Sequence, residues 1–293
     1  MHALLTEILA DGPVVTDGAW GTQMQQRGLP IGAAPDPWNL ERPETVAEVA
    51  RAYVAAGSRV ILTNTFGATR IALLRHGYAS RAADINRAGA EISRLAAAGR
   101  AYVFGSVGPT GKLPSMGEIE ESDLAEAFRE QIGGLADGGA DGIVVETMSD
   151  LAEACTATRC ASEAGLPVVA CMTFGAGKAG DRTIMGTTPE QAAEALLEAG
   201  ACIVGSNCGQ GAAAMSGVVA RLHAAGGRPV WAKPNAGLPS VRDGVAFYSQ
   251  APEDFVAEAW TLLEAGAGFV GGCCGTSPEF VRLLVARASA GLS

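Results

Sequence analysis

Three cysteines in glycine-rich surroundings are the residues of this chain most able to do chemistry. Cys273 and Cys274 are adjacent in the segment GGCCGT (271–276), and Cys208 lies in GSNCG (205–209). Adjacent residues in a strand point to opposite faces, so Cys273 and Cys274 can share a metal only where the strand has ended and the backbone bends, which the flanking glycines permit. Although a lone cysteine is most often a small buried side chain, this pattern favours one soft-metal site made by three thiolates.

The composition is that of an acidic chain with a large apolar fraction. It has 293 residues, 48% of them hydrophobic, and its 31 acidic and 21 basic side chains give a net charge of −10. This balance argues against nucleic acid as a partner. There is no long uncharged apolar run and no basic region of a signal peptide at the N-terminus, so we expect a cytoplasmic protein without a membrane segment. In the reducing cytosol, its seven cysteines would serve metals or catalysis more often than disulfides.

A short apolar run recurs along the chain, usually directly after a helical segment that ends in alanine and glycine. Glycine just beyond the last helical turn is the usual left-handed cap, and runs that are apolar throughout fit parallel strands buried on both faces. The expected strands are residues 13–16, 59–62, 101–104, 142–145, 167–170, 201–204, 229–232 and 268–270. The expected helices are residues 43–56, 80–98, 122–137, 150–164, 189–199, 212–225, 252–265 and 278–290.

Eight strand-and-helix units in a chain of this length predict an α/β fold, a single-domain (β/α)8 TIM barrel spanning residues 1–293. A doubly wound sheet is the main alternative, but no Gly-x-Gly-x-x-Gly motif opens a helix after the first strand. Working residues of such barrels lie at the C-terminal ends of the strands. Cys208 follows the sixth expected strand, and Cys273 and Cys274 follow the eighth, so all three are expected at one mouth. The other four cysteines lie within expected helices or strands and are assigned to packing: Cys155, Cys160, Cys171 and Cys202.

Two carboxylates end strands that face the same expected mouth. Asp17 follows the first strand, in a turn of small residues whose backbone N–H groups can receive an anion, and Glu146 ends the fourth. Beside a metal this pair can hold an ammonium group; ordinary solvated acids are the alternative. Asp150, close to Glu146, is equally well explained as a helix cap. The three histidines lie away from the expected strand ends, and neither a Gly-x-Ser-x-Gly elbow nor a P-loop is present, which leaves metal–thiolate chemistry.

Zinc held by three thiolates carries a net negative charge, so it is a poor Lewis acid and is ill suited to making hydroxide. It still deprotonates a thiol that occupies its fourth position, and the electron-rich ligand set keeps that sulfur nucleophilic. The pattern therefore points to S-alkylation. Two alternatives from other classes are a barrel whose zinc is purely structural, acting as a binding subunit, and a zinc hydrolase or aldolase. The hydrolase or aldolase usually requires histidine or carboxylate ligands.

Several motifs together resemble the homocysteine S-methyltransferase family, which includes betaine–homocysteine methyltransferase and the homocysteine module of cobalamin-dependent methionine synthase. These motifs are DGAxGT, NTF, GPTG, ETxxD, NCG and GGCCGT, beginning at residues 17, 64, 108, 146, 207 and 271. They occur in the family's order and extend over most of the chain. The resemblance implies a (β/α)8 barrel, in agreement with the strand count.

The resemblance also implies an activity, the transfer of a methyl group to the thiol of homocysteine to give methionine, and a zinc cofactor. The family's catalytic zinc ligands correspond to Cys208, Cys273 and Cys274. Its substrate-binding residues correspond to Asp17 and Glu146 for the amino group, and to Gly18 and Ala19 for the carboxylate. Asn235, near the expected mouth, is a further candidate, as a substrate contact or a resting-state ligand.

Two classes of methyl donor are compatible with the resemblance. The segments NCGQG (207–211) and PNAGLP (234–239) are most similar to the methionine synthase module. That likeness implies a methylated corrinoid, a form of cobalamin, carried on a separate protein. A small onium compound, betaine or S-methylmethionine, is the alternative donor.

Overall fold

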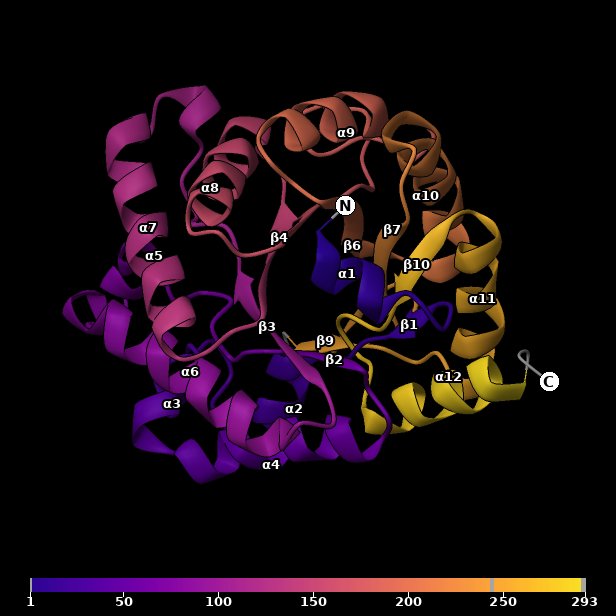
Figure 1. The fold of residues 1–293 in the computed structure, drawn as a ribbon, viewed down its shortest axis with the longest axis horizontal. Coiled ribbons are helices and arrows are strands. Elements are labelled where there is room, and N and C mark those ends of the chain that lie inside the picture. Colours follow the sequence, from indigo (N-terminus) through magenta and orange to yellow (C-terminus); the bar gives the residue numbers. More distant parts are fainter. Residues whose placement is uncertain (1, 243–244, 291–293) are drawn as a thin grey trace.

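The computed structural model describes residues 2–242 and 245–290, and its strands form the expected barrel (Figure 1). The eight parallel strands are β1 (Val14–Val15), β2 (Val60–Leu62), β3 (Tyr102–Val107), β4 (Gly142–Met148), β5 (Val168–Met172), β6 (Ile203–Gly211), β7 (Val230–Asn235) and β10 (Ala267–Val270). Hydrogen bonds join them in the order β1-β10-β7-β6-β5-β4-β3-β2. A bridge between Thr16 and Val60 brings the two edge strands together, so the barrel is nearly closed. The prediction of a (β/α)8 barrel is confirmed.

A ring of helices surrounds the strands (Figure 1). The main helices, each within two residues of its predicted bounds, are α4 (Pro43–Ala55), α6 (Ala82–Ala97), α7 (Glu121–Asp137), α8 (Leu151–Glu163), α9 (Pro189–Glu198), α10 (Ala212–Gly226), α11 (Pro252–Glu264) and α12 (Pro278–Ala290). Shorter helical segments lie in the connections that follow the first three strands: α2 (Trp20–Gln26), α3 (Trp38–Glu41), α5 (Arg70–Leu74), η1 (Ala79–Arg81) and η2 (Pro114–Met116).

Local sequence signals determine several of these boundaries. Thr188 and Gln191 form a reciprocal capping box at the start of α9, where each side chain bonds to the other residue's backbone. The carboxylate of Asp150 accepts hydrogen bonds from two N–H groups in the first turn of α8. The interpretation of Asp150 as a helix cap is therefore confirmed.

Besides the shorter helical segments, two further features of the fold were not predicted. Helix α1 (Ala3–Ile8) lies across the barrel axis in Figure 1, and its Leu5 and Ile8 side chains are buried in the interior cluster that also holds Trp231 and Phe269. It closes the end of the barrel where the strands begin. The second is an antiparallel hairpin of β8 (Ser240–Arg242) and β9 (Val245–Phe247), between β7 and α11.

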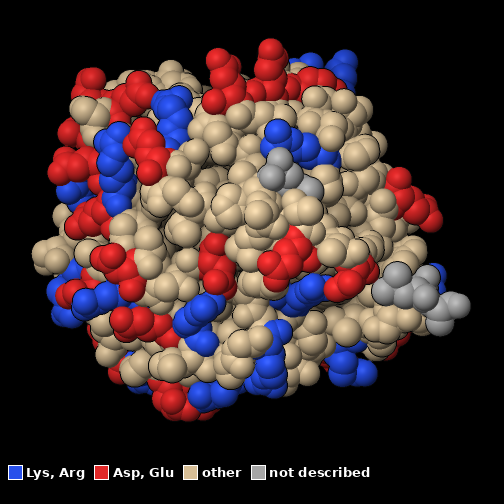
Figure 2. Space-filling model, viewed as in Figure 1, with Lys and Arg blue, Asp and Glu red and all other residues tan. Residues whose placement is uncertain are grey.

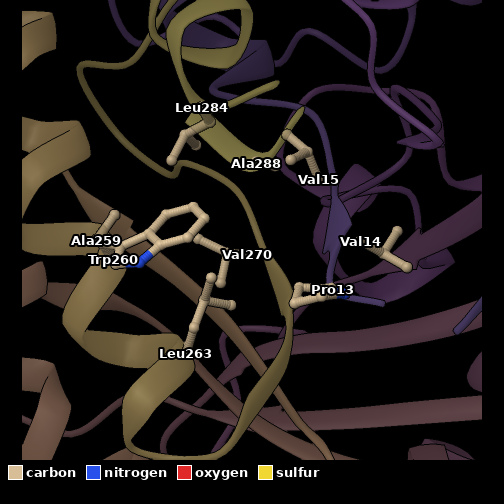
Figure 3. Close-up of a pocket in the computed structure, with 9 residues that line it drawn as sticks. All are labelled: Pro13, Val14, Val15, Ala259, Trp260, Leu263, Val270, Leu284 and Ala288. Atoms are coloured by element: carbon tan, nitrogen blue, oxygen red, sulfur yellow. The ribbon is translucent and has the colours of Figure 1, made fainter. Parts of the chain in front are cut away.

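The layer between the strands and the outer helices is also apolar. A cavity of about 10 Å³ lies between α11, α12 and the strands β1 and β10, and Figure 3 shows the side chains that line it. The indole ring of Trp260 extends along it, and the guanidinium carbon of Arg287 lies 4.8 Å from the centre of that ring. None of the residues that line this cavity belongs to the predicted site, so the chemistry lies elsewhere.

Charged side chains are distributed around the edge of the molecule. In the view of Figure 2, basic and acidic residues are interspersed around the perimeter. Exposed ion pairs such as Arg129–Glu163, with 3.2 Å between Nη2 and Oε2, contribute about 1 kcal/mol or less to stability. Within the described residues, no helix has both the length and the apolar character that crossing a membrane requires.

Candidate metal centre and substrate site

The three predicted metal ligands come together at the C-terminal mouth of the barrel. The Sγ atoms of Cys208, Cys273 and Cys274 lie within 4.8 Å of one another, and those of Cys208 and Cys274 are 4.0 Å apart. All three side chains are half-buried. Across residues 2–242 and 245–290, this is the only group of three or more His, Cys, Asp or Glu side chains close enough to share a metal ion.

These distances fit a zinc ion. Two sulfurs bound to one tetrahedral zinc at about 2.3 Å each are about 3.8 Å apart, close to the 4.0 Å that separates the sulfurs of Cys208 and Cys274. Thiolates are also ligands that zinc prefers. Three protein ligands leave the fourth corner of the tetrahedron for another group, as in catalytic zinc sites and unlike closed structural ones.

An irregularity in β6 places Cys208. The strand continues to Gly211, so Cys208 lies within it. The prediction that Cys208 follows the end of this strand is wrong. The pairing of β6 with β7 is regular as far as Asn207 and then shifts, and Cys208 has a left-handed φ of 60°. This break in the strand geometry, which the sequence pattern did not reveal, brings the Cys208 sulfur to the other two.

Cys273 and Cys274 lie just beyond β10, as predicted, in a loop bound to its neighbours. The N–H of Cys273 donates to the carbonyl of Pro234 in β7 at 2.7 Å, and the N–H of Gly272 donates to the carbonyl of Asp17 at 3.0 Å. The Cys273 carbonyl accepts a bond from the hydroxyl of Thr276 at 2.8 Å. The loop is therefore held from both adjacent strands of the barrel.

Glycine is required on both sides of the cysteine pair. A Cβ atom on Gly271 would lie 2.0 Å from Oγ1 of Thr16. Gly275 has a φ of +83°, and a Cβ there would lie 2.4 Å from the Cβ of Tyr248. The close approach at the first position and the left-handed backbone at the second explain why glycines frame the cysteines.

In the absence of a cation, the three thiols cannot all ionise. Hydrogen bonds from Cys273 and Cys274 lower the pKa of Cys208 to about 3. The same contact with Cys208 raises the pKa of Cys274 to about 11 and that of Cys273 well above its ordinary value. The cluster holds one negative charge readily and requires a positive partner to hold three.

Asp17 lies at the mouth, as predicted, but its oxygens are already engaged. The side chain is 0% exposed. Its Oδ1 accepts a bond from Nζ of Lys233 at 2.5 Å, and its Oδ2 accepts bonds from Nε1 of Trp20 and the backbone N–H of Leu62, both at 2.7 Å. The alternative of an ordinary solvated acid does not hold for Asp17, because it is a fully buried carboxylate with a cationic partner.

Glu146 is the second buried carboxylate and is 7% exposed. It lies within β4, two residues before the end of the strand, where the pairing with β5 shifts and Thr147 has a φ of 62°. Ser106 donates to its Oε1 at 2.5 Å. Burial raises the pKa of Glu146, while the charge of Lys233 and the Ser106 hydrogen bond oppose the rise.

Asn207 joins the carboxylate to the sulfur cluster. Its Nδ2 lies 3.2 Å from Oε2 of Glu146 and 3.9 Å from Sγ of Cys273, and its Oδ1 accepts a bond from the N–H of Thr147 at 2.7 Å. Asn207 is fully buried. One buried amide thus fixes the spacing between the carboxylate of Glu146 and the cysteine cluster.

The turn at Gly18 and Ala19 leads into α2. Thr276 accepts a bond from the Ala19 N–H at 3.1 Å, and Tyr53 donates to the Ala19 carbonyl at 2.9 Å. No side chain caps the start of α2. A Cβ on Gly18 would lie 2.8 Å from Oγ1 of Thr276, so this turn is packed directly against the cysteine loop.

Two more polar side chains border the cluster. Asn235, 3% exposed, forms a side-chain hydrogen bond with Cys208, but its Oδ1 has no partner although it is buried. Tyr248 forms a side-chain hydrogen bond with Cys274, and burial and this neighbour raise the pKa of the phenol. Asn235 was predicted at the mouth; Tyr248 was not.

Sequence reasoning gave no role to several residues that build the site, namely Lys233, Ser106, Asn207, Tyr248 and Thr276. For Lys233 a signal was present, because a lysine directly after the apolar run of a buried strand, at an expected strand end, requires a charged partner if it is buried. The predicted packing residues behave as expected. Cys155 and Cys160 lie in α8 and Cys171 lies in β5, whereas Cys202 lies one residue before β6.

The fold and the cysteine cluster together define a class: a (β/α)8 barrel with a three-thiol site able to hold a metal at its C-terminal mouth. Residues 14–288 match the family model described as homocysteine S-methyltransferase, and the chain belongs to that family.

Comparison with individual proteins agrees with this assignment. The chain is 34% identical over 301 residues to the methionine synthase of Mycobacterium tuberculosis and 33% identical to that of Mycobacterium leprae. Each alignment covers 96% of this chain and 25% of the relative, so the chain spans a quarter of the length of these methionine synthases.

Solved structures share the fold. The metallated form of the homocysteine methyltransferase MmuM from Escherichia coli superposes with a TM-score of 0.80 at 21% identity, covering 96% of this chain and 99% of that one. A complete pyruvate carboxylase from Rhizobium etli gives a TM-score of 0.53 at 13% identity, over 96% of this chain and 28% of that one. At these identities the likeness concerns the barrel alone.

Proposed function

We propose that this chain transfers a methyl group to the thiol of homocysteine, forming methionine, with zinc held by Cys208, Cys273 and Cys274. The observation that carries the proposal is the bridge made by Asn207, whose Nδ2 contacts both Glu146 at 3.2 Å and the sulfur of Cys273 at 3.9 Å. The three-thiol cluster and a buried carboxylate thus lie on either side of one amide. A substrate with a thiol at one end and an amino group at the other fits that arrangement.

When bound, zinc would supply a fourth position that keeps the substrate sulfur deprotonated at neutral pH. The protein's own part is to position the reacting sulfur. The cysteine loop is fixed to Pro234, Asp17 and Thr276 by the hydrogen bonds described above, so the site is preorganised. A preorganised thiolate needs only a methyl donor in line with it.

The remaining groups would hold the amino-acid end of the substrate. Asp17 and Glu146 give the pocket its negative charge, which suits an ammonium group. The carboxylate would lie at the turn of Gly18 and Ala19, where the N–H of Ala19 is already bound to Thr276 and the N–H groups of the uncapped first turn of α2 are the donors that remain. Asn235 has an unpartnered buried Oδ1, which supports its role as a substrate contact or a resting-state ligand.

We propose a methylated corrinoid on a separate protein, or on a further module, as the methyl donor. The likeness to methionine synthases four times as long supports a donor presented by another folded unit. Exposed apolar side chains also occur on segments that follow strands and approach the mouth: Ile31, Phe66, Met116, Ile184 and Leu238. Leu238, three residues beyond Asn235, is 72% exposed, as expected where a second macromolecule covers the rim.

The direct test is an assay of methionine formation by the zinc-loaded chain with homocysteine and each donor in turn. We expect product with a methylated corrinoid carrier and none with betaine or S-methylmethionine. Product with one of the small donors alone would establish the alternative donor. Two results would refute zinc-dependent methyl transfer. One is that no methionine forms with any of the three donors, and the other is that methyl transfer is undiminished after a chelator has removed the zinc.

A barrel with a purely structural zinc is the competing class. The described residues offer no fourth His, Cys, Asp or Glu within reach of the cluster, which favours the catalytic interpretation. A fourth permanent protein ligand and no binding of thiols would support the structural one. All seven cysteines are free, in keeping with the cytoplasmic location that we propose.

A further inference from the structure

Lys233 is a buried lysine that pairs with one of the two buried carboxylates of the candidate site. It lies near the end of β7 and is 2% exposed, and its Nζ lies 2.5 Å from Oδ1 of Asp17. Burial by itself lowers the pKa of Lys233, but the charges of Asp17 and Glu146 outweigh that effect and leave it raised. Lys233 is therefore a permanent cation beside both carboxylates that were predicted to hold the substrate ammonium.

The capacity of Asp17 to accept further donors is almost used up. A carboxylate has about four acceptor positions, and three of those of Asp17 are taken by Lys233, Trp20 and the N–H of Leu62. No surface of Asp17 is exposed toward the mouth. A substrate ammonium group would have to take the remaining position directly beside the like charge of Lys233, or displace Lys233 and leave that ammonium group buried without its partner.

Glu146 is in a different position. Its two described donors are neutral, the hydroxyl of Ser106 and the amide of Asn207, and it retains a small exposed surface. Two carboxylates and one lysine give this part of the pocket one net negative charge. That charge matches a single ammonium group. Without Lys233, Asp17 and Glu146 would repel each other when both are ionised, which would raise the pKa of at least one of the two.

We propose that Lys233 is a positioning residue that occupies the cation site of Asp17, so that the α-amino group of the substrate is recognised by Glu146 alone. This rests on homocysteine as the substrate. Asp17 then acts through Lys233, as its counter-ion, and not as a direct contact of the substrate. The same arrangement makes the pocket specific for one ammonium group.

The test compares homocysteine with 4-mercaptobutanoate, which has the same thiol and carboxylate but no amino group. The affinity of the zinc-loaded protein for each is measured by titration calorimetry, and their ratio isolates recognition of the amino group. In the unmodified protein we expect homocysteine to bind about 10- to 100-fold more tightly, the range for a hydrogen bond to a charged group. Equal affinity for the two ligands would overturn the proposal.

Two variants then distinguish the contribution of Glu146 to this affinity ratio from that of the Asp17–Lys233 pair. Glu146→Gln is expected to reduce the ratio to about 3 or less, because the amide carries no charge. The double variant Asp17→Asn/Lys233→Met removes the pair together, so no charge is left buried alone. We expect it to keep the ratio of the unmodified protein within about 3-fold. Because Lys233 also opposes the rise in the pKa of Glu146, the double variant is titrated at increasing pH, and a ratio that stays as low as in Glu146→Gln would show that Asp17 contacts the amino group directly.

If circular dichroism shows that the double variant does not fold, a crystal structure of the unmodified zinc-loaded protein with homocysteine replaces it as the test. That structure shows which carboxylate binds the amino group. The proposal requires Nζ of Lys233 on Asp17 and the amino nitrogen on Glu146; an amino nitrogen on Asp17 with Lys233 displaced contradicts it. Methyl transfer is assayed separately. Binding of homocysteine with the expected ratio, but without methyl transfer from any donor, would refute the proposed function and leave the role of Lys233 standing.

Discussion

At the scale of single residues, the sulfurs and the carboxylates of the site are held in different ways. The cysteines are half-buried and lie in irregular backbone, whereas Asp17 and Glu146 are buried, and each of their four carboxylate oxygens accepts a hydrogen bond. A half-buried sulfur can exchange a partner, and a buried carboxylate with satisfied bonds keeps its place. The site thus combines reactive groups that a ligand can reach with charges that do not move.

The cysteines are expected to matter for metal binding more than for stability. Changing Cys208, Cys273 or Cys274 singly to Ala should lower the zinc content, measured by atomic emission, from about one per chain to well below half, because two thiolates bind zinc far more weakly than three. The free energy of unfolding of the metal-free protein should change by about 1 kcal/mol or less, since these side chains are only half-buried.

Cys155→Ala is the matched control, because Cys155 is also half-buried but lies in α8. It should leave the zinc content unchanged. Full zinc content in any one of the three ligand variants would contradict the assignment of that cysteine.

Asp36 gives a prediction on pH. It is fully buried in the segment before α3, and its Oδ1 accepts a bond from the N–H of Gly67 at 2.8 Å. Burial raises its pKa from 3.8 to about 6. The folded protein therefore binds more protons than the unfolded chain between these values, so the contribution of Asp36 to stability is largest below 3.8 and is lost as the pH rises through about 6.

Asn at position 36 cannot ionise but can still accept the bond from Gly67. The difference in unfolding free energy, unmodified protein minus Asp36→Asn, should fall by about 2 kcal/mol between about pH 4 and about pH 7. Urea denaturation of both proteins at a series of pH values measures it. A difference that is constant over this range would show that Asp36 is ionised throughout.

Much of this site could be predicted at the residue level, for a physical reason. The three cysteines, Asp17 and Glu146 all lie at or near strand ends, and the barrel brings such ends to one mouth whatever their distance in sequence. Partners could not be predicted in the same way. That Lys233 binds Asp17 and that Asn207 joins Glu146 to Cys273 depend on side-chain directions across strands, which one sequence does not encode by spacing.

At the scale of elements, the site depends on how the connection after β10 is joined to the one after β1. Thr276 makes that junction: it is fully buried, accepts from the N–H of Ala19 and donates to the carbonyl of Cys273. Gly18 and Gly272 both approach its hydroxyl too closely to carry a side chain. One hydroxyl therefore fixes the turn proposed for the substrate carboxylate relative to Cys273, a proposed metal ligand.

Thr276→Val keeps the shape of the side chain and removes both hydrogen bonds. We expect it to lower the free energy of unfolding by about 1–3 kcal/mol, the cost of leaving buried polar groups unsatisfied, and to raise the KM for homocysteine more than it lowers kcat. Steady-state kinetics and urea denaturation measure the two effects. Thr276→Ser, which retains the hydroxyl, should restore most of both, and an unchanged KM in Thr276→Val would contradict the proposed junction.

The elements themselves divide into those with strong sequence signals and those without. The outer helices have apolar periodicity, caps and terminal glycines, and they appear within two residues of the expected bounds. Helix α1 has six residues and each strand of the β8–β9 hairpin has three, too short for a periodic pattern. The bends at Cys208 and Thr147 place non-glycine residues at positive φ, which no sequence rule anticipates.

At the scale of the whole molecule, the barrel separates stability from chemistry. Helix α1 and the aromatic cluster of Trp231 and Phe269 close the end where strands begin, while the thiols and carboxylates lie where strands end. The chain spans a quarter of the methionine synthases that it matches. We propose that residues 1–293 act as one homocysteine-binding unit and that another folded unit brings the methyl group.

The most direct test of the central claim is X-ray absorption at the zinc edge, with and without homocysteine. Three cysteines and one open position predict three sulfurs and one lighter atom around zinc in the resting protein, and four sulfurs once homocysteine is added. 4-Mercaptobutanoate at saturating concentration should give the same four-sulfur spectrum, because it carries the same thiol. A ligand set that homocysteine leaves unchanged would contradict the account of this site as one that binds the substrate sulfur.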